Sequence, residues 1–104
     1  IKNLKIANLS IEFYTKKNLE DNVTILRQKN IVILKEDFFS QSSEVVFRSL
    51  TKVINIVGKK YYAVRGKKID KVIDLIRFKS SFKVTLGGCI IKKVNETVIL
   101  SKEQ

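Results

Sequence analysis

The segment Phe82–Lys93, FKVTLGGCIIKK, decides how the C-terminal part of the chain folds. Its first five residues alternate apolar and polar side chains, which is typical of a half-buried β-strand. Two adjacent glycines and then Cys89 follow. A phosphate-binding glycine loop would continue into a helix, whereas β-branched residues follow here. We therefore expect Gly87 and Gly88 to form a bulge or sharp bend that changes which face of the strand is buried.

Cys89 is the only cysteine, so the chain cannot form an internal disulfide. The chain contains no histidine to activate a thiol, and apolar residues follow the cysteine. We interpret Cys89 as a small buried apolar side chain rather than a nucleophile. The acidic pairs Glu20-Asp21 and Glu36-Asp37 are adjacent in sequence, and adjacent side chains diverge on a helix or a strand. No catalytic residue and no metal ligand is therefore predicted.

Two amphipathic helices are predicted in the middle of the chain. Ser42 and Ser43 suit the N-cap of the first, and Glu44 suits its positive end. Apolar residues then recur at spacings of three and four up to Gly58, which we expect to end the helix. After the basic segment KKYYAVRG, the same spacing predicts a second helix, with an apolar stripe formed by Ile69, Val72, Ile73 and Ile76.

The remaining segments complete an α+β pattern. Leu4–Asn18 has helical spacing, and the β-branched runs Val23–Leu26 and Ile31–Leu34 indicate a strand or weak hairpin, with at least the second run a strand. Thr97–Ser101 can pair antiparallel with Cys89–Lys93 around a turn near residues 94–96. We expect three to four helices packed on a small antiparallel sheet of about three strands. The length of 104 residues favours a single domain, residues 1–104.

The positive charge of the chain is concentrated in one region. Of the formal net charge of +11, the segment Lys59–Lys93 carries +9, with eleven lysines and arginines against two aspartates. Such a cluster indicates a nucleic-acid footprint, because a general lysine bias would spread the charge evenly. Tyrosines interleaved with cations are typical of RNA binders. The predicted RNA-binding residues are Lys59, Lys60, Tyr61, Tyr62, Arg65, Lys67, Lys68, Lys71, Lys92 and Lys93.

Some of these residues could instead have a purely structural role. One of the two tyrosines could fill the core, and Arg65 could equally pair with a carboxylate.

The longest apolar run, Ile31–Leu34, is too short for a membrane span or a signal sequence. With a single cysteine, the chain suits a reducing, cytoplasmic setting. It begins with isoleucine and contains no methionine, so we expect it to be part of a longer protein.

Two stretches resemble the C-terminal part of the bacterial tRNA(Ile)-lysidine synthetase (MesJ) family. They are EVVFRSLTKVINIVGKKYYAVRGKKIDKVIDLI, residues 44–76, and TLGGCIIKKVNETVILSKEQ, residues 85–104. The matching positions are Arg48-Ser49-Leu50, Gly58, Tyr62, Arg65, Thr85–Cys89, Ile91 and Lys102-Glu103. The likeness covers about residues 31–104. It departs from the family at Ala63-Val64, where prolines are usual, and at Lys102, where arginine is usual.

The resemblance implies a cytoplasmic enzyme that adenylates the wobble cytidine of a tRNA with ATP and joins lysine to it. The family's nucleotide-binding S-G-G-x-D-S loop does not occur in this sequence. The resemblance therefore implies a non-catalytic tRNA-binding domain without a cofactor of its own. An N-terminal catalytic domain would bind ATP and Mg²⁺ and would be its protein partner.

Two alternatives remain open. The order of elements also matches a winged-helix DNA-binding domain, although the connection from Gly58 to Val64 exceeds the turn of a helix-turn-helix. The chain could also be a packing or dimerisation module whose basic face is incidental. The sequence does not indicate an oligomeric state.

Overall fold

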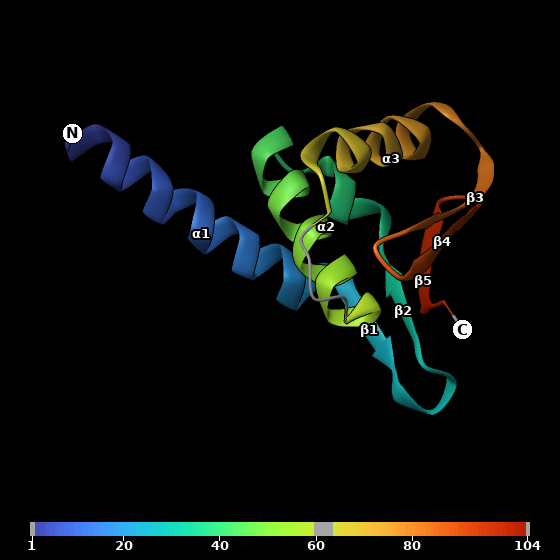
Figure 1. The fold of residues 1–104 in the computed structure, drawn as a ribbon. Helices are drawn as coiled ribbons and strands as arrows, with labels where there is room; N and C mark the ends of the chain where they lie inside the picture. The colour runs from blue at the N-terminus through green and yellow to red at the C-terminus, as the bar shows by residue number, and fades with distance from the viewer. Residues whose placement is uncertain (1, 60–63, 104) are drawn as a thin grey trace.

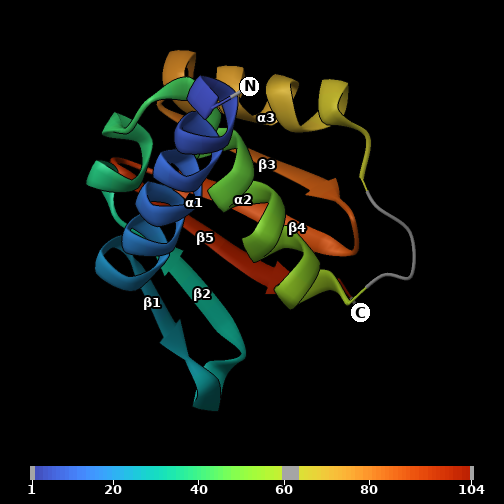
Figure 2. The ribbon, with the colours of Figure 1, turned by 90° about the vertical axis from the view of Figure 1, so that its left-hand side faces the viewer.

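The computed structural model describes residues 2–59 and 64–103, with only the backbone described for residues 2–7. The elements are α1 (Lys2–Asn22), β1 (Val23–Leu26), η1 (Arg27–Lys29), β2 (Ile31–Leu34), η2 (Glu36–Ser40), α2 (Ser43–Gly58), α3 (Gly66–Phe78), β3 (Ser81–Leu86), β4 (Cys89–Val94) and β5 (Thr97–Lys102). The helices lie on one side of the sheet, with α2 in front of the strands and α3 along one end (Figures 1 and 2).

The sheet contains five antiparallel strands in the order β1-β2-β5-β4-β3, so the expectation of about three strands was wrong. The run Val23–Leu26 forms its own strand, paired with β2. The segment before the glycines is also a separate strand, because Leu86 pairs with Cys89. Gly87 and Gly88 have φ values of 60° and 81°, which suit the two-residue turn of a hairpin. The glycines thus reverse the chain, whereas the sequence interpretation had one strand bending there.

The core lies between the sheet and helices α2 and α3. Alternate residues of the central strands point toward the helices, since successive side chains in a strand face opposite sides. These residues are Val32, Leu34, Cys89, Ile91, Val98 and Leu100. The predicted apolar stripe of the second helix, from Ile69 to Ile76, is buried against them. Figure 2 shows that the helices cover only this face of the sheet.

Helix α2 begins and ends where its sequence predicts, after Ser42 and at Gly58. The Ser42 hydroxyl accepts a hydrogen bond from the Val45 N–H at 3.4 Å, which caps the first turn. Gly58 is the last helical residue, and Lys59 adopts the left-handed conformation with φ 51°. A Cβ on Gly58 would lie 1.9 Å from the Gly87 carbonyl oxygen. The glycine is therefore required by the close approach of α2 to the β3–β4 turn, and the left-handed residue is the lysine.

Helix α1 packs against the rest of the chain through its C-terminal part, and its N-terminal part projects away (Figure 1). The buried Asn18 side chain donates to the Phe38 carbonyl at 3.2 Å and to the Ser49 hydroxyl at 3.1 Å. These bonds fix α1 against η2 and α2. None of the helices in residues 2–59 and 64–103 combines the length and hydrophobicity that a membrane span requires.

Candidate nucleic-acid interface

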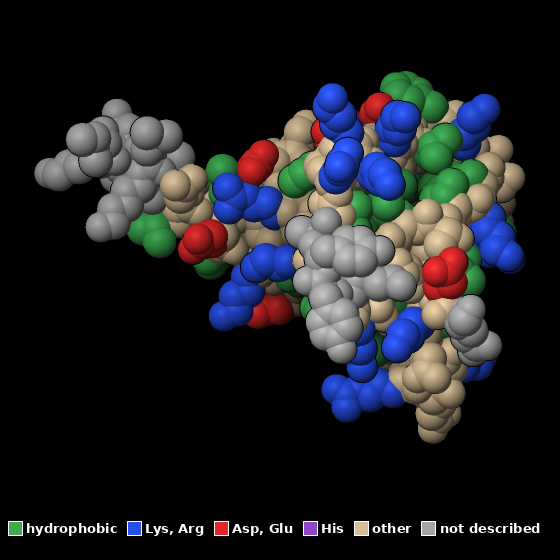
Figure 3. All heavy atoms as spheres, in the orientation of Figure 1, with side chains coloured by type: hydrophobic (Ala, Val, Ile, Leu, Met, Phe, Trp, Pro, Cys, Tyr) green, Lys and Arg blue, Asp and Glu red, His purple; other side chains and the backbone are tan. Residues whose placement is uncertain are grey.

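The first turns of α3 carry a dense group of cations. Arg65 is the N-cap residue, and Lys67, Lys68 and Lys71 follow on the exposed side of the helix. Figure 3 shows lysine and arginine side chains gathered over this end of α3. The helix has no acidic residue in its first turn. We call the surface formed by these four residues the α3 basic surface.

Helix stability does not account for the α3 basic surface. The N-terminus of a helix is the positive end of its dipole, so a cation there is unfavourable by about 0.3–1 kcal/mol. Free backbone N–H groups in the same turn add to the positive potential. The arrangement therefore lowers the stability of α3 slightly and creates a surface suited to phosphate groups.

Lys59 lies at the end of α2, exposed, in the left-handed conformation. A residue with a Cβ is disfavoured there by about 1–2 kcal/mol relative to the right-handed region. In the described ranges, the other non-glycine residues with positive φ are Asn30 and Asn95, and asparagine tolerates this conformation. The predicted residues Lys60, Tyr61 and Tyr62 lie outside the described residues.

The structure does not bring Lys92 and Lys93 to the α3 basic surface. Lys93 is half-buried, and its Nζ donates to the carbonyls of Ile76 and Lys79, the latter at 3.0 Å. Lys93 thus binds the C-terminal end of α3, where a cation is favourable. Lys92 points to the opposite face of the sheet, where it pairs across the strands with Lys83.

A cavity of about 930 Å³ lies between the β1–β2 hairpin, the end of α2 and the end of β5. We call it the hairpin pocket. Four cations line it, and three of them, Arg27, Lys29 and Lys102, were not among the predicted binding residues. They lie outside the charged segment Lys59–Lys93, and no local pattern in the sequence links them. Figure 3 shows basic side chains in this region on the same face as the α3 basic surface.

Gly88 and Cys89 are buried and Gly87 is half-buried, so these residues pack inward rather than form a surface site. A Cβ on Gly87 would lie 2.5 Å from the Val64 side chain, and the Gly88 carbonyl accepts from the Glu103 N–H at 2.8 Å. The buried Cys89 thiol donates to the Ile54 carbonyl at 3.2 Å, and burial raises the pKa of this thiol to about 11. The thiol is therefore protonated at neutral pH. Within the described ranges, no three potential metal-binding side chains of His, Cys, Asp or Glu lie together.

Comparison with known proteins finds two similar curated proteins, both tRNA(Ile)-lysidine synthases. The chain is 25% identical over 101 residues to the protein of Wolbachia sp. subsp. Brugia malayi (strain TRS), and 27% identical over 101 residues to that of Wolbachia pipientis wMel. Each match covers 96% of this chain and 23% of the relative. The chain thus spans about a quarter of the length of these relatives. No family model matches the chain, and no solved structure matches it significantly.

Proposed function

We propose that this chain is the non-catalytic, tRNA-binding domain of a cytoplasmic tRNA(Ile)-lysidine synthase. The observation that carries the proposal is the similarity to two enzymes of that name across 96% of the chain. The α3 basic surface supports it independently, because its cations offset no acidic residue in the first turn of the helix. In this proposal, ATP and Mg²⁺ bind to the catalytic part of the enzyme rather than to this domain.

The α3 basic surface would hold the tRNA backbone. Lys67, Lys68 and Lys71 offer flexible point charges to phosphate oxygens, and the planar guanidinium of Arg65 can donate two parallel hydrogen bonds. Each phosphate that is neutralised releases counterions, which supplies affinity without reading sequence. The domain would thereby hold the substrate while the catalytic part acts on it.

Helix α1 would contact the catalytic part of the same enzyme. Leu9, Phe13 and Tyr14 are large, apolar and more than half exposed on α1. The two rings pack edge to face, with centroids 5.3 Å apart. The relatives are about four times as long as the aligned region, so a longer protein has chain available to cover this surface. With the catalytic part supplied as a separate chain, Phe13→Ser should weaken its association with this domain and leave tRNA binding unchanged.

A salt titration tests the tRNA-binding function. Fluorescently labelled tRNA is titrated with the chain at several salt concentrations, and the affinity is plotted against salt on logarithmic axes. With about four to six phosphates contacted, we expect a slope of about −3 to −5. Replacing Lys67, Lys68 and Lys71 together with glutamine should flatten the slope by about one unit per lost contact.

The matched control is the replacement of Lys16 and Lys17 with glutamine, because both are exposed lysines of α1 and are not part of the α3 basic surface. This control should change the slope little. Duplex DNA should compete poorly with tRNA, which presents 2′-hydroxyls and an A-form backbone. Equal binding of DNA and tRNA, with equal effects of both sets of lysines, would leave only non-specific attraction to a basic protein. Preferred binding of DNA would favour the winged-helix alternative.

A further inference from the structure

The hairpin pocket combines exposed apolar side chains with cations. Ile25 of β1 and Ile56 of α2 both line it, and they are 56% and 61% exposed. Val32, which pairs with Ile25 across the strands, and Val57, which follows Ile56 in α2, also line the pocket. The volume of about 930 Å³ lies within the range of sites that hold small organic groups, about 300–1,000 Å³.

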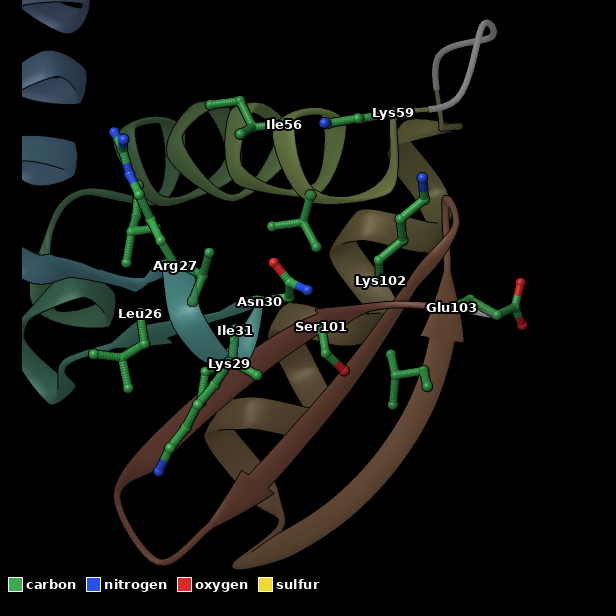
Figure 4. A pocket seen from close by; sticks show the side chains of 14 residues that line it. Leu26, Arg27, Lys29, Asn30, Ile31, Ile56, Lys59, Ser101, Lys102 and Glu103 are labelled. Carbon is green, nitrogen blue, oxygen red and sulfur yellow. The ribbon is translucent and has the colours of Figure 1, made fainter.

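The charged groups around this pocket favour an anionic ligand. Arg27, Lys29, Lys59 and Lys102 line it, against the single carboxylate of Glu103. In Figure 4 the Lys59 and Lys102 side chains approach the pocket from the side of α2 and β5, and Arg27 stands across from them. Lys29 and Glu103 extend away from this group in the same view. The Asn30 amide lies between the cations.

We propose that the hairpin pocket binds an unpaired nucleotide of the RNA that the α3 basic surface holds. The base would lie against Ile25 and Ile56, and its flanking phosphates would contact Arg27, Lys59 and Lys102. The Asn30 amide offers one acceptor and two donors, and the Ser101 hydroxyl also lines the pocket, so both can bind the polar edge of a base. RNA-binding proteins commonly recognise such unstacked bases. The inference rests on the proposed function, because it requires that the chain bind RNA.

Three observations favour a nucleotide within RNA over a free nucleotide. The cations come from η1, from the residue after α2 and from β5, around an open pocket, which suits phosphates entering and leaving along a chain. Basic side chains also lie near the β1–β2 hairpin on the same face as the α3 basic surface (Figure 3). Lys59 lines the pocket, and Arg65, the N-cap of α3, follows six residues later in the sequence, so the two surfaces are close along the chain.

The backbone of Lys59 supports a role for its side chain in binding. Glycine would adopt the left-handed conformation at this position without strain, and lysine does so at a cost of about 1–2 kcal/mol. A disfavoured backbone conformation that persists often belongs to a functional position. At Lys59 the strained residue is also a cation that lines the pocket.

The test compares two RNA hairpins that share one duplex, one with a blunt end and one with a four-nucleotide unpaired 3′ extension. Affinities are measured by fluorescence anisotropy with the 104-residue chain. We expect the extension to increase affinity about tenfold, and Ile25→Ala with Ile56→Ala to remove most of this gain. Both side chains are more than half exposed, so the double variant should fold.

Phe78→Ala is the matched control, because Phe78 is 81% exposed and does not line the pocket. It should leave the tenfold gain intact. Equal affinities for the two hairpins, with no effect of the isoleucine variants, would overturn the pocket inference and leave tRNA binding in place. Failure of both hairpins and of tRNA to bind would overturn the proposed function as well. Saturable binding of AMP that the isoleucine variants abolish, without a gain from the extension, would assign the pocket to a free nucleotide and also overturn the inference.

Discussion

Replacing Gly58 with alanine should destabilise the chain by about 2–3 kcal/mol. The new Cβ would lie 1.9 Å from the Gly87 carbonyl oxygen and 3.0 Å from the Gly87 carbonyl carbon. To reach even a 3.0 Å separation from the oxygen, the two backbones would have to move apart by about 1.1 Å. Both contacts are to backbone atoms of a tight turn, so no side chain can rotate away. The strain therefore falls on the packing of α2 against the β3–β4 hairpin.

The magnitude follows from three contributions. Overpacking of a filled core costs about 1–3 kcal/mol. Moving the turn would also weaken the hydrogen bond from Cys89 to Ile54, which is worth about 0.5–1.5 kcal/mol. Alanine has a better helix propensity than glycine by at most about 1 kcal/mol, and this gain is smaller at the last helical residue. The balance is a loss of about 2–3 kcal/mol.

Urea unfolding followed by circular dichroism measures this loss. Gly66→Ala is the matched control, because Gly66 also lies at a helix terminus, and its added Cβ would meet only the end of the Phe47 ring at 3.2 Å. The Phe47 ring can shift, and alanine reduces the conformational entropy of the unfolded chain. Gly66→Ala should therefore raise the free energy of unfolding by between zero and about 1 kcal/mol. If the two variants had the same stability, the close approach of α2 to the turn would be refuted.

Three further predictions concern residues at or near the candidate site. Lys59→Gly should raise the free energy of unfolding by about 1 kcal/mol, because it relieves the left-handed strain, and should weaken RNA binding in the anisotropy assay; a loss of stability would contradict this. In urea unfolding, Lys93→Gln should lower the free energy of unfolding by about 1 kcal/mol, because it removes the bonds to the end of α3, whereas Lys92→Gln should leave it unchanged. In the anisotropy assay, Lys93→Gln should leave RNA affinity nearly unchanged. Burial raises the pKa of the Cys89 thiol from 9.0 to about 11, so the folded state favours the protonated thiol, and the stability that this contributes is present below about pH 9 and lost as the pH rises through 11. Cys89→Ala should be less sensitive to pH across this window, and equal pH dependence of the two proteins would argue against the burial effect.

The helices could be predicted from sequence because their signals are local. Ser42 before a periodic apolar run marks the start of α2, and the stripe from Ile69 to Ile76 predicts the buried face of α3. The number of strands in the sheet could not be predicted in the same way. Its central pairing joins β2 to β5, with Ile31 opposite Ser101, and such a distant contact leaves no local pattern. Four-residue strands such as β1 are also too short for periodicity to establish.

The candidate site was predicted only in part, because charge counted along the chain does not say which way a side chain points. Lys92 and Lys93 are adjacent in the basic segment, yet a strand sends them to opposite faces, and one of them binds the end of α3. Conversely, Arg27 and Lys102 lie far apart in sequence and line one pocket. A helix start such as α3 is easier to predict, since its lysines stay on one turn.

Gly87 and Gly88 do not line the hairpin pocket, but the turn that they form lies next to residues that do. Gly87 touches the last residue of α2, which places Lys59, and the pairing of Cys89 with Lys102 places the second cation of the hairpin pocket beside the same turn. The Gly88 carbonyl accepts from the backbone of Glu103, which fixes the end of β5. A shift of the turn should therefore move two of the pocket cations together. In conditions where Gly58→Ala remains folded, it should reduce the gain from the unpaired RNA extension more than it reduces binding of the blunt hairpin. Equal reductions for both RNAs would mean that the turn supports the fold without positioning the pocket.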